Sequence, residues 1–180
     1  MKLIGVAFLA LLLAQPITAY AGAAAGPNDV ASVRRFVQNF YDWYTPMSLN
    51  EKILSPVDHT LKSKGSAFIP TLSKALREDS VASAKVKDMV VGLDFDPFLA
   101  SQDPETHYTV GKIVQKNGSY YVSVHGVRSG KQSPKADVVV KVEKLKGSWR
   151  FTNFLYPDGT NLLSVLKELK KERARHPSNS

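Results

Sequence analysis

Cysteine is absent from this chain of 180 residues. Its absence excludes disulfide bonds, catalysis by a thiol, thiolate ligation of a metal and lipid attachment to a cysteine side chain. A chain of this length can still bury a stable core without crosslinks. The fold therefore has to depend on the packing of apolar side chains.

Long apolar runs are also absent, apart from one at the N-terminus. The segment 3–14 is an apolar run that follows Lys2, and an Ala19-x-Ala21 motif comes shortly after it. A basic start, a short apolar run and an Ala-x-Ala end are typical of a secretory signal peptide. The run is shorter than the ~20 residues that a membrane-spanning helix needs.

We therefore expect residues 1–21 to be a signal peptide that is cleaved after Ala21, and residues 22–27 to be a linker. An N-terminal anchor that is never cleaved is the alternative. The product is expected to be periplasmic or secreted, with no transmembrane segment after cleavage.

Histidine is scarce, and no two histidines have the close spacing of zinc ligands. The four are His59, His107, His125 and His176. Ser123 and His125 are expected on one strand face with Asp137 on the next strand, but no glycine-flanked turn surrounds Ser123 as in a nucleophile elbow. A solvated polar face is the simpler interpretation, so we expect no catalytic residue, no metal and no cofactor.

Positive charge is concentrated in the second half of the chain. Residues 22–106 carry 9 Lys/Arg and 11 Asp/Glu, whereas residues 107–180 carry 14 and 5. Such a basic half suits an anionic envelope component or an acidic protein partner. Nucleic acid is not expected as a partner of an exported protein. Scattered solvating lysines are the alternative, and the sequence does not indicate an oligomeric state.

The first half of the chain has the period of amphipathic helices. Apolar residues recur every three or four positions from a cap at Asn28 or Asp29 up to Pro46, which predicts a first helix. A short second helix is expected after Ser55. A third pattern runs from residue 71 to Gly92, which is expected to act as a left-handed helix terminator.

After Pro104 the period changes to two, which is typical of strands with one buried face. Turns are expected at Asn117-Gly118 and Lys146-Gly147, with a longer polar loop over residues 129–134. The side chains expected to face the core are Tyr108, Val110, Val114, Tyr120, Val122, Val124, Val138, Val140, Val142, Trp149, Phe151 and Leu155.

The order of these elements predicts an α+β fold: N-terminal helices packed on a curved four-stranded antiparallel meander, with a C-terminal helix. Residues 28–169 should form a single domain, and residues 170–180 a frayed basic tail. A curved sheet around a long helix would leave a conical hollow, as in cystatin-like and nuclear transport factor 2-like folds.

The segment 92–104, Gly-Leu-Asp-Phe-Asp-Pro-Phe-Leu-Ala-Ser-Gln-Asp-Pro, combines carboxylates with aromatic rings. A calcium loop needs an oxygen ligand and a glycine where this segment has Phe98 and Leu99, which disfavours a metal. Asp96-Pro97 is typical of a cap followed by proline, and Asp103-Pro104 repeats it. We therefore expect a structural clip between the helices and the sheet, rather than an acid/base site, made by Asp94, Phe95, Asp96, Pro97, Phe98, Gln102 and Asp103.

Several stretches resemble domain-of-unknown-function family 3828, the YbjP-like envelope proteins. They are residues 41–44 (Tyr-Asp-Trp-Tyr), 94–99, 102–103, 149–151, 153–156 and 159–163. The resemblance covers nearly all of the mature chain and is most specific in the clip. It implies an exported bacterial protein with a small helical and antiparallel-sheet domain, and it supplies no catalytic residues. Some members resemble lipoproteins, but this chain lacks the required cysteine.

Six residues are candidates for binding because they belong either to the expected hollow or to the basic half. They are Tyr41, Tyr44, Tyr120, His125, Lys141 and Arg150. The sequence thus predicts an exported, non-enzymatic binding or interaction module. An immunity-type protein that neutralises a periplasmic toxin and a small-molecule enzyme that uses the hollow are the alternatives.

Overall fold

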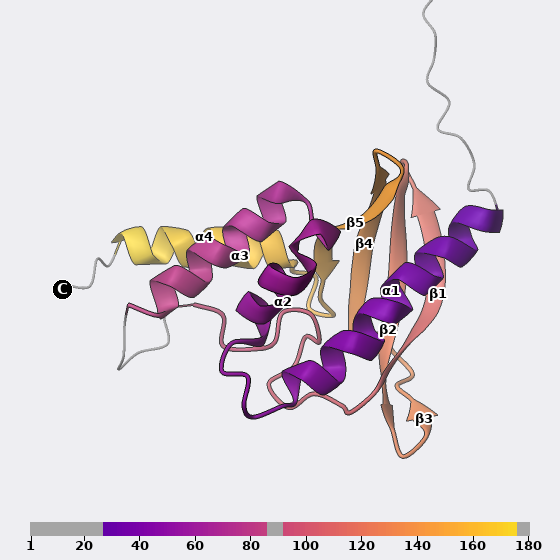
Figure 1. Cartoon of the computed structure of the whole chain (residues 1–180), viewed down its shortest axis with the longest axis horizontal. Helices are drawn as coiled ribbons and strands as arrows, with labels where there is room; N and C mark the ends of the chain where they lie inside the picture. The colour runs from indigo at the N-terminus through magenta and orange to yellow at the C-terminus, as the bar shows by residue number, and fades with distance from the viewer. Residues whose placement is uncertain (1–26, 86–91, 176–180) are drawn as a thin grey trace, which may run out of the picture.

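The computed structural model describes residues 27–85 and 92–175, and it has the predicted α+β fold (Figure 1). The predicted signal peptide and the end of the basic tail lie outside these residues. The elements are α1 (Pro27–Ser48), α2 (Pro56–Lys64), the 3-10 turn η1 (Gly65–Ala67), α3 (Pro70–Ser83), β1 (Tyr108–Lys116), β2 (Ser119–Arg128), β3 (Lys131–Gln132), β4 (Val138–Leu145), β5 (Ser148–Leu155) and α4 (Leu162–Arg175).

The sheet is antiparallel in the order β1-β2-β4-β5, which confirms the predicted meander, and the short β3 pairs with the end of β2. Two-residue turns connect β1 to β2 at Asn117-Gly118 and β4 to β5 at Lys146-Gly147. Both residues of each turn have positive φ. Turns of this kind match the twist of a hairpin and favour Asn and Gly.

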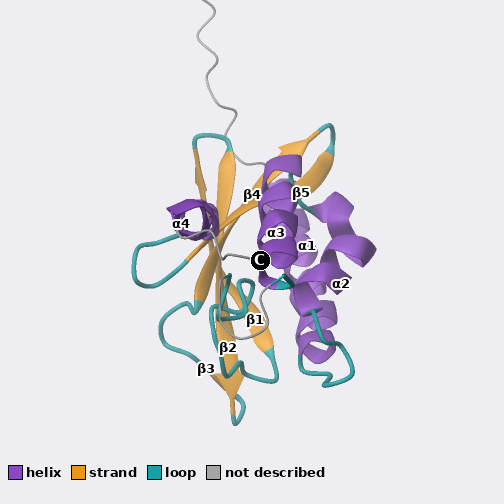
Figure 2. Ribbon diagram, turned by 90° about the vertical axis from the view of Figure 1, so that its left-hand side faces the viewer, coloured by secondary structure: helices purple, strands orange, loops and turns teal. Residues whose placement is uncertain are grey.

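All three N-terminal helices lie on one face of the sheet (Figure 2), and α4 lies beside α3, to which the Arg173–Asp79 and Lys170–Glu78 ion pairs join it. The covered face carries the predicted valine rows of β2 and β4, which are fully buried. Among the described residues, no helix is both long and apolar enough to cross a membrane.

Two bulges change which side chains face the core. In β1 the register shifts between Val110 and Ile113, so that Ile113 pairs with the buried Val122, and Val114 lies on the outer face, 43% exposed. The prediction that Val114 faces the core is therefore wrong. A bulge adds one residue to a strand and reverses its alternation from that point.

The bulge in β5 has the same effect around Thr152. This residue is the extra one opposite Lys141 and Val142, and its hydroxyl donates to the Lys141 carbonyl over 3.2 Å. Phe151 and Phe154 are both buried as a result, although a regular strand would turn them to opposite faces. Leu155, which was expected to face the core, pairs with Val139 and points to the opposite face of the sheet.

Two helix ends differ from the sequence-based expectation. α3 ends at Ser83 rather than near Gly92, and the predicted apolar positions at 86–91 lie outside the described residues. Gly92 does not have a left-handed backbone; a Cβ there would collide with the Ser83 and Asp79 side chains. α4 continues to Arg175, so a helix extends into the predicted basic tail.

Side chains of α1 satisfy the free backbone edge of β1. The Gln38 amide donates to the Tyr108 carbonyl over 2.9 Å and accepts the Val110 N–H over 2.8 Å, as a neighbouring strand would. Arg34 donates to the carbonyls of Val110 and Gly111 over 2.7 and 2.9 Å. An open edge is a template for pairing with another chain, and these two side chains occupy its first part, from Tyr108 to Gly111.

The Gln38→Ala variant should therefore be less stable and more prone to self-association. It loses two partly buried hydrogen bonds, a loss of about 1–2 kcal/mol in the free energy of unfolding. Asn39→Ala is the control because Asn39 is exposed on the same helix. Denaturant unfolding and light scattering measure both effects, and equal behaviour of the two variants would contradict the proposed role of Gln38.

Candidate functional site

The expected hollow is filled by side chains. Three of the binding candidates, Tyr41, Tyr44 and Tyr120, are 1%, 0% and 4% exposed, so they belong to the core. Tyr44 also borders an open cleft beside the segment 94–103. Burial raises the pKa of the Tyr41 hydroxyl well above its usual value, and that hydroxyl donates to the Phe98 carbonyl over 2.8 Å. These tyrosines hold the fold together and cannot contact a ligand in this conformation.

Phenylalanine rings occupy the space between α1 and the sheet. The ring of Phe40 lies 4.7 Å from Phe151 and 5.7 Å from Phe98, measured between ring centroids. Phe98 in turn lies 5.0 Å from Phe154 and 5.4 Å from Phe68. Edge-to-face and tilted contacts at these distances stabilise aromatic clusters. We call these five residues the aromatic cluster.

The segment 94–103 forms the predicted clip, and Asp96 is its centre. One Asp96 carboxylate oxygen accepts the N–H groups of Phe98 and Leu99 over 2.9 and 3.1 Å. The other accepts the Tyr44 hydroxyl over 2.7 Å. Burial raises the pKa of Asp96 above its ordinary value, although all three hydrogen bonds oppose the shift. Asp96 therefore caps a single helical turn, as the Asp-Pro motif predicts.

The remaining clip residues divide into buried and exposed ones. Phe98 is 0% exposed, whereas Phe95 is only half-buried, with its ring edge-on to Tyr156 at 5.3 Å. The expectation that both phenylalanines are core anchors therefore holds only for Phe98. Gln102 donates to the Asp94 carbonyl over 3.1 Å and closes the loop.

Asp103 does not repeat the capping role of Asp96. Its side chain is exposed, and its own N–H is bonded to the Ser101 hydroxyl over 3.0 Å. Among the described residues, its carboxylate does not cap a turn as the second Asp-Pro motif predicted.

Asp79 on α3 is a further anchor that the sequence did not reveal. Its carboxylate is 4% exposed, accepts the Leu93 N–H over 3.0 Å and pairs with Arg173 of α4 at 2.6 Å. One carboxylate thus connects α3, the start of the clip and α4. The signal that could have indicated it is an acidic residue within the apolar stripe of α3, between Leu76 and Ser83.

Two neighbouring clefts of about 780 and 440 Å³ lie beside the clip and share four wall residues, Val57, Leu93, Phe95 and Pro97. Asp96 contributes to the wall of the larger cleft, but both of its oxygens already accept hydrogen bonds. Three of the about four acceptor positions of the Asp96 carboxylate are thus used inside the clip, two on Oδ1 and one on Oδ2. The larger cleft is also bordered by the exposed Asp94.

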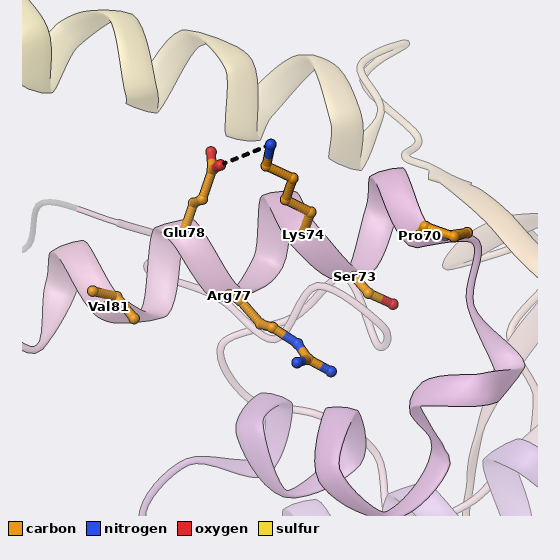
Figure 3. Close-up of a pocket in the computed structure, with 6 residues that line it drawn as sticks. All are labelled: Pro70, Ser73, Lys74, Arg77, Glu78 and Val81. Carbon is orange, nitrogen blue, oxygen red and sulfur yellow. Dashed lines mark ion pairs between the residues drawn. The ribbon is translucent and has the colours of Figure 1, made fainter.

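A third depression, of about 510 Å³, is lined by residues of α3 alone (Figure 3). Figure 3 shows Lys74 and Glu78 directed toward each other, with 3.9 Å between them, and Arg77 directed away from that pair. A surface made by one helix does not enclose a ligand. This depression is thus part of the exposed helix surface.

The other three binding candidates lie on the outer face of the sheet, opposite the helices. His125 pairs with Thr109 on that face, and Lys141 lies between Tyr121 and Asn153 of the neighbouring strands. Arg150 lies opposite Glu143. We call this surface the outer face; its described members include Val114, Tyr121, Ser123, His125, Val139, Lys141, Glu143, Arg150 and Asn153.

Much of the positive charge is neutralised within the chain. Lys141 pairs with Glu143 at 2.9 Å and lowers the pKa of that carboxyl group through a hydrogen bond. Lys170 pairs with Glu78 at 2.7 Å, and Lys171 with Glu168 at 2.7 Å. The basic half therefore presents less free positive charge to a partner than its number of cations suggests.

The Ser123, His125 and Asp137 arrangement does not form a catalytic relay. The His125 Nδ1 atom contacts the Ser133 carbonyl at 2.9 Å, and the Asp137 carboxylate accepts the Gly126 N–H at 2.7 Å. Across residues 27–85 and 92–175, no three His, Asp or Glu side chains gather as a metal site would require.

No protein-family model matches the chain. No curated protein matches it either.

The Phe98→Ala variant should lose about 3–5 kcal/mol in the free energy of unfolding, because it removes a fully buried ring from the aromatic cluster. Phe95→Ala is the matched control on the same loop and should lose clearly less, about 1–2 kcal/mol, since Phe95 is only partly buried. Denaturant unfolding measures both. Equal losses would contradict the assignment of Phe98 as the anchor of the clip.

Asp96→Asn should show a pH-dependent difference in stability from the wild type. Because the folded pKa of Asp96 is raised, the folded wild type loses stability as the pH rises from the ordinary carboxyl pKa of about 3.9 through the raised value. Asparagine caps almost as well and does not ionise. The variant should therefore gain stability relative to the wild type as the pH rises through that window.

Asp94→Asn, which removes an exposed carboxylate from the same loop, is the control for the change in net charge. Urea unfolding across the acidic pH range gives the two difference curves. A flat curve for Asp96→Asn, or one with the opposite slope, would exclude a costly buried charge at this position.

Proposed function

We propose that the chain is an exported, non-enzymatic interaction module that contacts its partner through the outer face. The observation that carries this proposal is the filling of the space between α1 and the sheet by the aromatic cluster, which closes the expected conical hollow to a substrate. The clefts beside the clip are open grooves, and most acceptor positions of Asp96 are used inside the clip, so the small-molecule enzyme gains little support from the geometry.

The composition of the outer face also supports an interaction role. It combines the exposed Val114 with Tyr121, Ser123 and the Lys141–Glu143 pair. Interfaces of transient complexes mix apolar contact area with polar groups, and tyrosine is enriched in them. The resemblance to envelope proteins of family 3828 and the signal-like start of the chain support export to the periplasm.

The first test concerns export, and it is made on protein isolated from the native host. Mass spectrometry should give an N-terminus near Gly22 in the periplasmic or secreted fraction. An intact Met1 in the membrane fraction would contradict cleavage, and an intact Met1 in the cytoplasm would contradict export.

The second test concerns the surface, and it uses the absence of cysteine. Ser123→Cys places a single thiol on the outer face, and Ser63→Cys places one on the exposed side of α2 as a control. Thiol crosslinking in the native compartment should capture a partner from position 123 only. A toxin as the captured protein would identify an immunity role, whereas equal capture from position 63, or no capture from either, would overturn the assigned surface.

A further inference from the structure

One end of the sheet brings together the start of α1 and both hairpin turns. The Lys144 ammonium pairs with Asp29 at the start of α1 over 2.8 Å, and the Trp149 indole N–H donates to Ser32 over 2.9 Å. The Ser119 hydroxyl, next to the β1–β2 turn, donates to Glu143 near the β4–β5 turn over 2.8 Å. Figure 1 shows both turns at the end of the sheet from which the chain enters α1.

This end is basic. Its cations are Lys116, Lys141, Lys144, Lys146 and Arg150, and its carboxylates are Asp29 and Glu143. Both carboxylates are already engaged by Lys144 and Lys141. Lys116 and Lys146 have no carboxylate partner among the described residues, so their charge is available to an outside anion.

An apolar side chain accompanies these cations. Leu145 is 42% exposed between two lysines at the tip of the β4–β5 hairpin. We call Lys116, Lys144, Leu145 and Lys146, which lie beside the two turns, the basic end. A lysine–leucine–lysine tip can place its cations among headgroups and its apolar side chain at the acyl boundary.

The opposite end of the sheet is electrically balanced. Its cations are Arg128, Lys131 and Lys135, and its carboxylates are Asp103, Glu105 and Asp137. The Arg128 guanidinium pairs with Glu105 at 2.6 Å. The charge difference between the two ends gives the molecule a preferred orientation in the field of an anionic surface.

The position of the N-terminus indicates which surface this is. Residues 1–26, with their apolar run at 3–14, join the domain at Pro27, which belongs to the same end. A cleaved chain that starts at Gly22 has only five residues before Pro27, which span at most about 18 Å. While the apolar run is still attached during export, the basic end is the part of the domain nearest to the membrane. After cleavage, only the charge and the apolar tip of this end can hold it there.

We propose that the basic end docks on the surface of an anionic phospholipid bilayer, with the two hairpin tips toward the headgroups. The inference rests on the export in the proposed function and adds a second surface to it. The docked orientation leaves Ser123 and the adjoining part of the outer face free for a partner.

The binding test uses the protein recovered from its host and vesicles of phosphatidylcholine with one-third phosphatidylglycerol. Each surface lysine should contribute about fivefold to binding of an anionic bilayer, so Lys116→Gln with Lys146→Gln should weaken binding about 25-fold. Lys131→Gln with Lys135→Gln makes the same charge change at the opposite end and should have little effect. Any binding by a retained apolar run is common to both variants and cancels in the comparison.

The orientation test compares two equivalent turn positions. Asn117 and Ser129 each begin a two-residue turn with positive φ, at opposite ends of β2. Single cysteines at these positions carry an environment-sensitive fluorophore, and only the label at Asn117→Cys should shift to the blue on anionic vesicles.

Equal losses in the two lysine pairs, equal shifts of the two labels, or equal binding to vesicles of phosphatidylcholine alone would each overturn this inference. Circular dichroism of the glutamine variants confirms that they are folded. If vesicle docking fails while a thiol at position 123 still captures a protein, the docking inference is wrong and the proposed function as an interaction module is still supported. If docking succeeds and position 123 captures nothing, the basic end stands and the outer face is excluded.

Discussion

The apolar face of the sheet has to be sealed from water, and the aromatic cluster that seals it determines where the other elements lie. Phe40 of α1 contacts Phe151 of β5 and Phe98 of the clip, so a helix, a strand and a loop meet at one ring. Aromatic rings bury more apolar area than any other side chains. The core can therefore be closed by few elements, which is consistent with a chain that has no disulfide bond.

Sealing the core with a loop creates a second constraint, because the loop carries backbone groups that need partners. Asp96 satisfies two N–H groups of the clip and accepts the Tyr44 hydroxyl. The Tyr41 hydroxyl donates a hydrogen bond to the Phe98 carbonyl, and the Tyr156 hydroxyl donates one to the Pro97 carbonyl over 3.0 Å. A buried carboxylate is costly, but leaving these groups unpaired would cost more. Asp96, Tyr41 and Tyr44, whose polar groups resemble those of a binding site, thus serve to let the clip enter the core.

The sequence was informative where one residue decides the local structure. Asn117-Gly118 and Lys146-Gly147 predicted both hairpin turns because their positive φ values suit glycine and asparagine. The strand faces were correct only up to each bulge. A residue type such as Thr152 does not indicate a bulge. Beyond it, Phe154 faces the core in place of Leu155, for which that position was predicted.

The candidate site was predicted less well than the fold, because residue type and period do not state exposure. Tyr41 and Tyr44 have polar tips that would suit a pocket, but their hydroxyls find partners inside the core. Lys141 and Arg150 lie on the outer face, as strand alternation from the buried Val140, Val142 and Phe151 requires, because Arg150 precedes the bulge of its strand. The Asp79–Arg173 pair joins residues far apart in the sequence, and no local sequence pattern predicts that these two residues meet.

Net charge is a poor guide to the surface of this protein until the ion pairs are taken into account. The basic half contributes lysines to Glu78, Glu143 and Asp29, so part of its charge bridges elements and is not presented to a partner. Exposed ion pairs of this kind add little stability, but they cancel the field beyond a few ångströms. What remains is a local excess at the hairpin tips, where Lys116 and Lys146 have no carboxylate partner among the described residues. The free positive charge of the sheet is therefore concentrated at the end that carries the Asn117-Gly118 and Lys146-Gly147 turns.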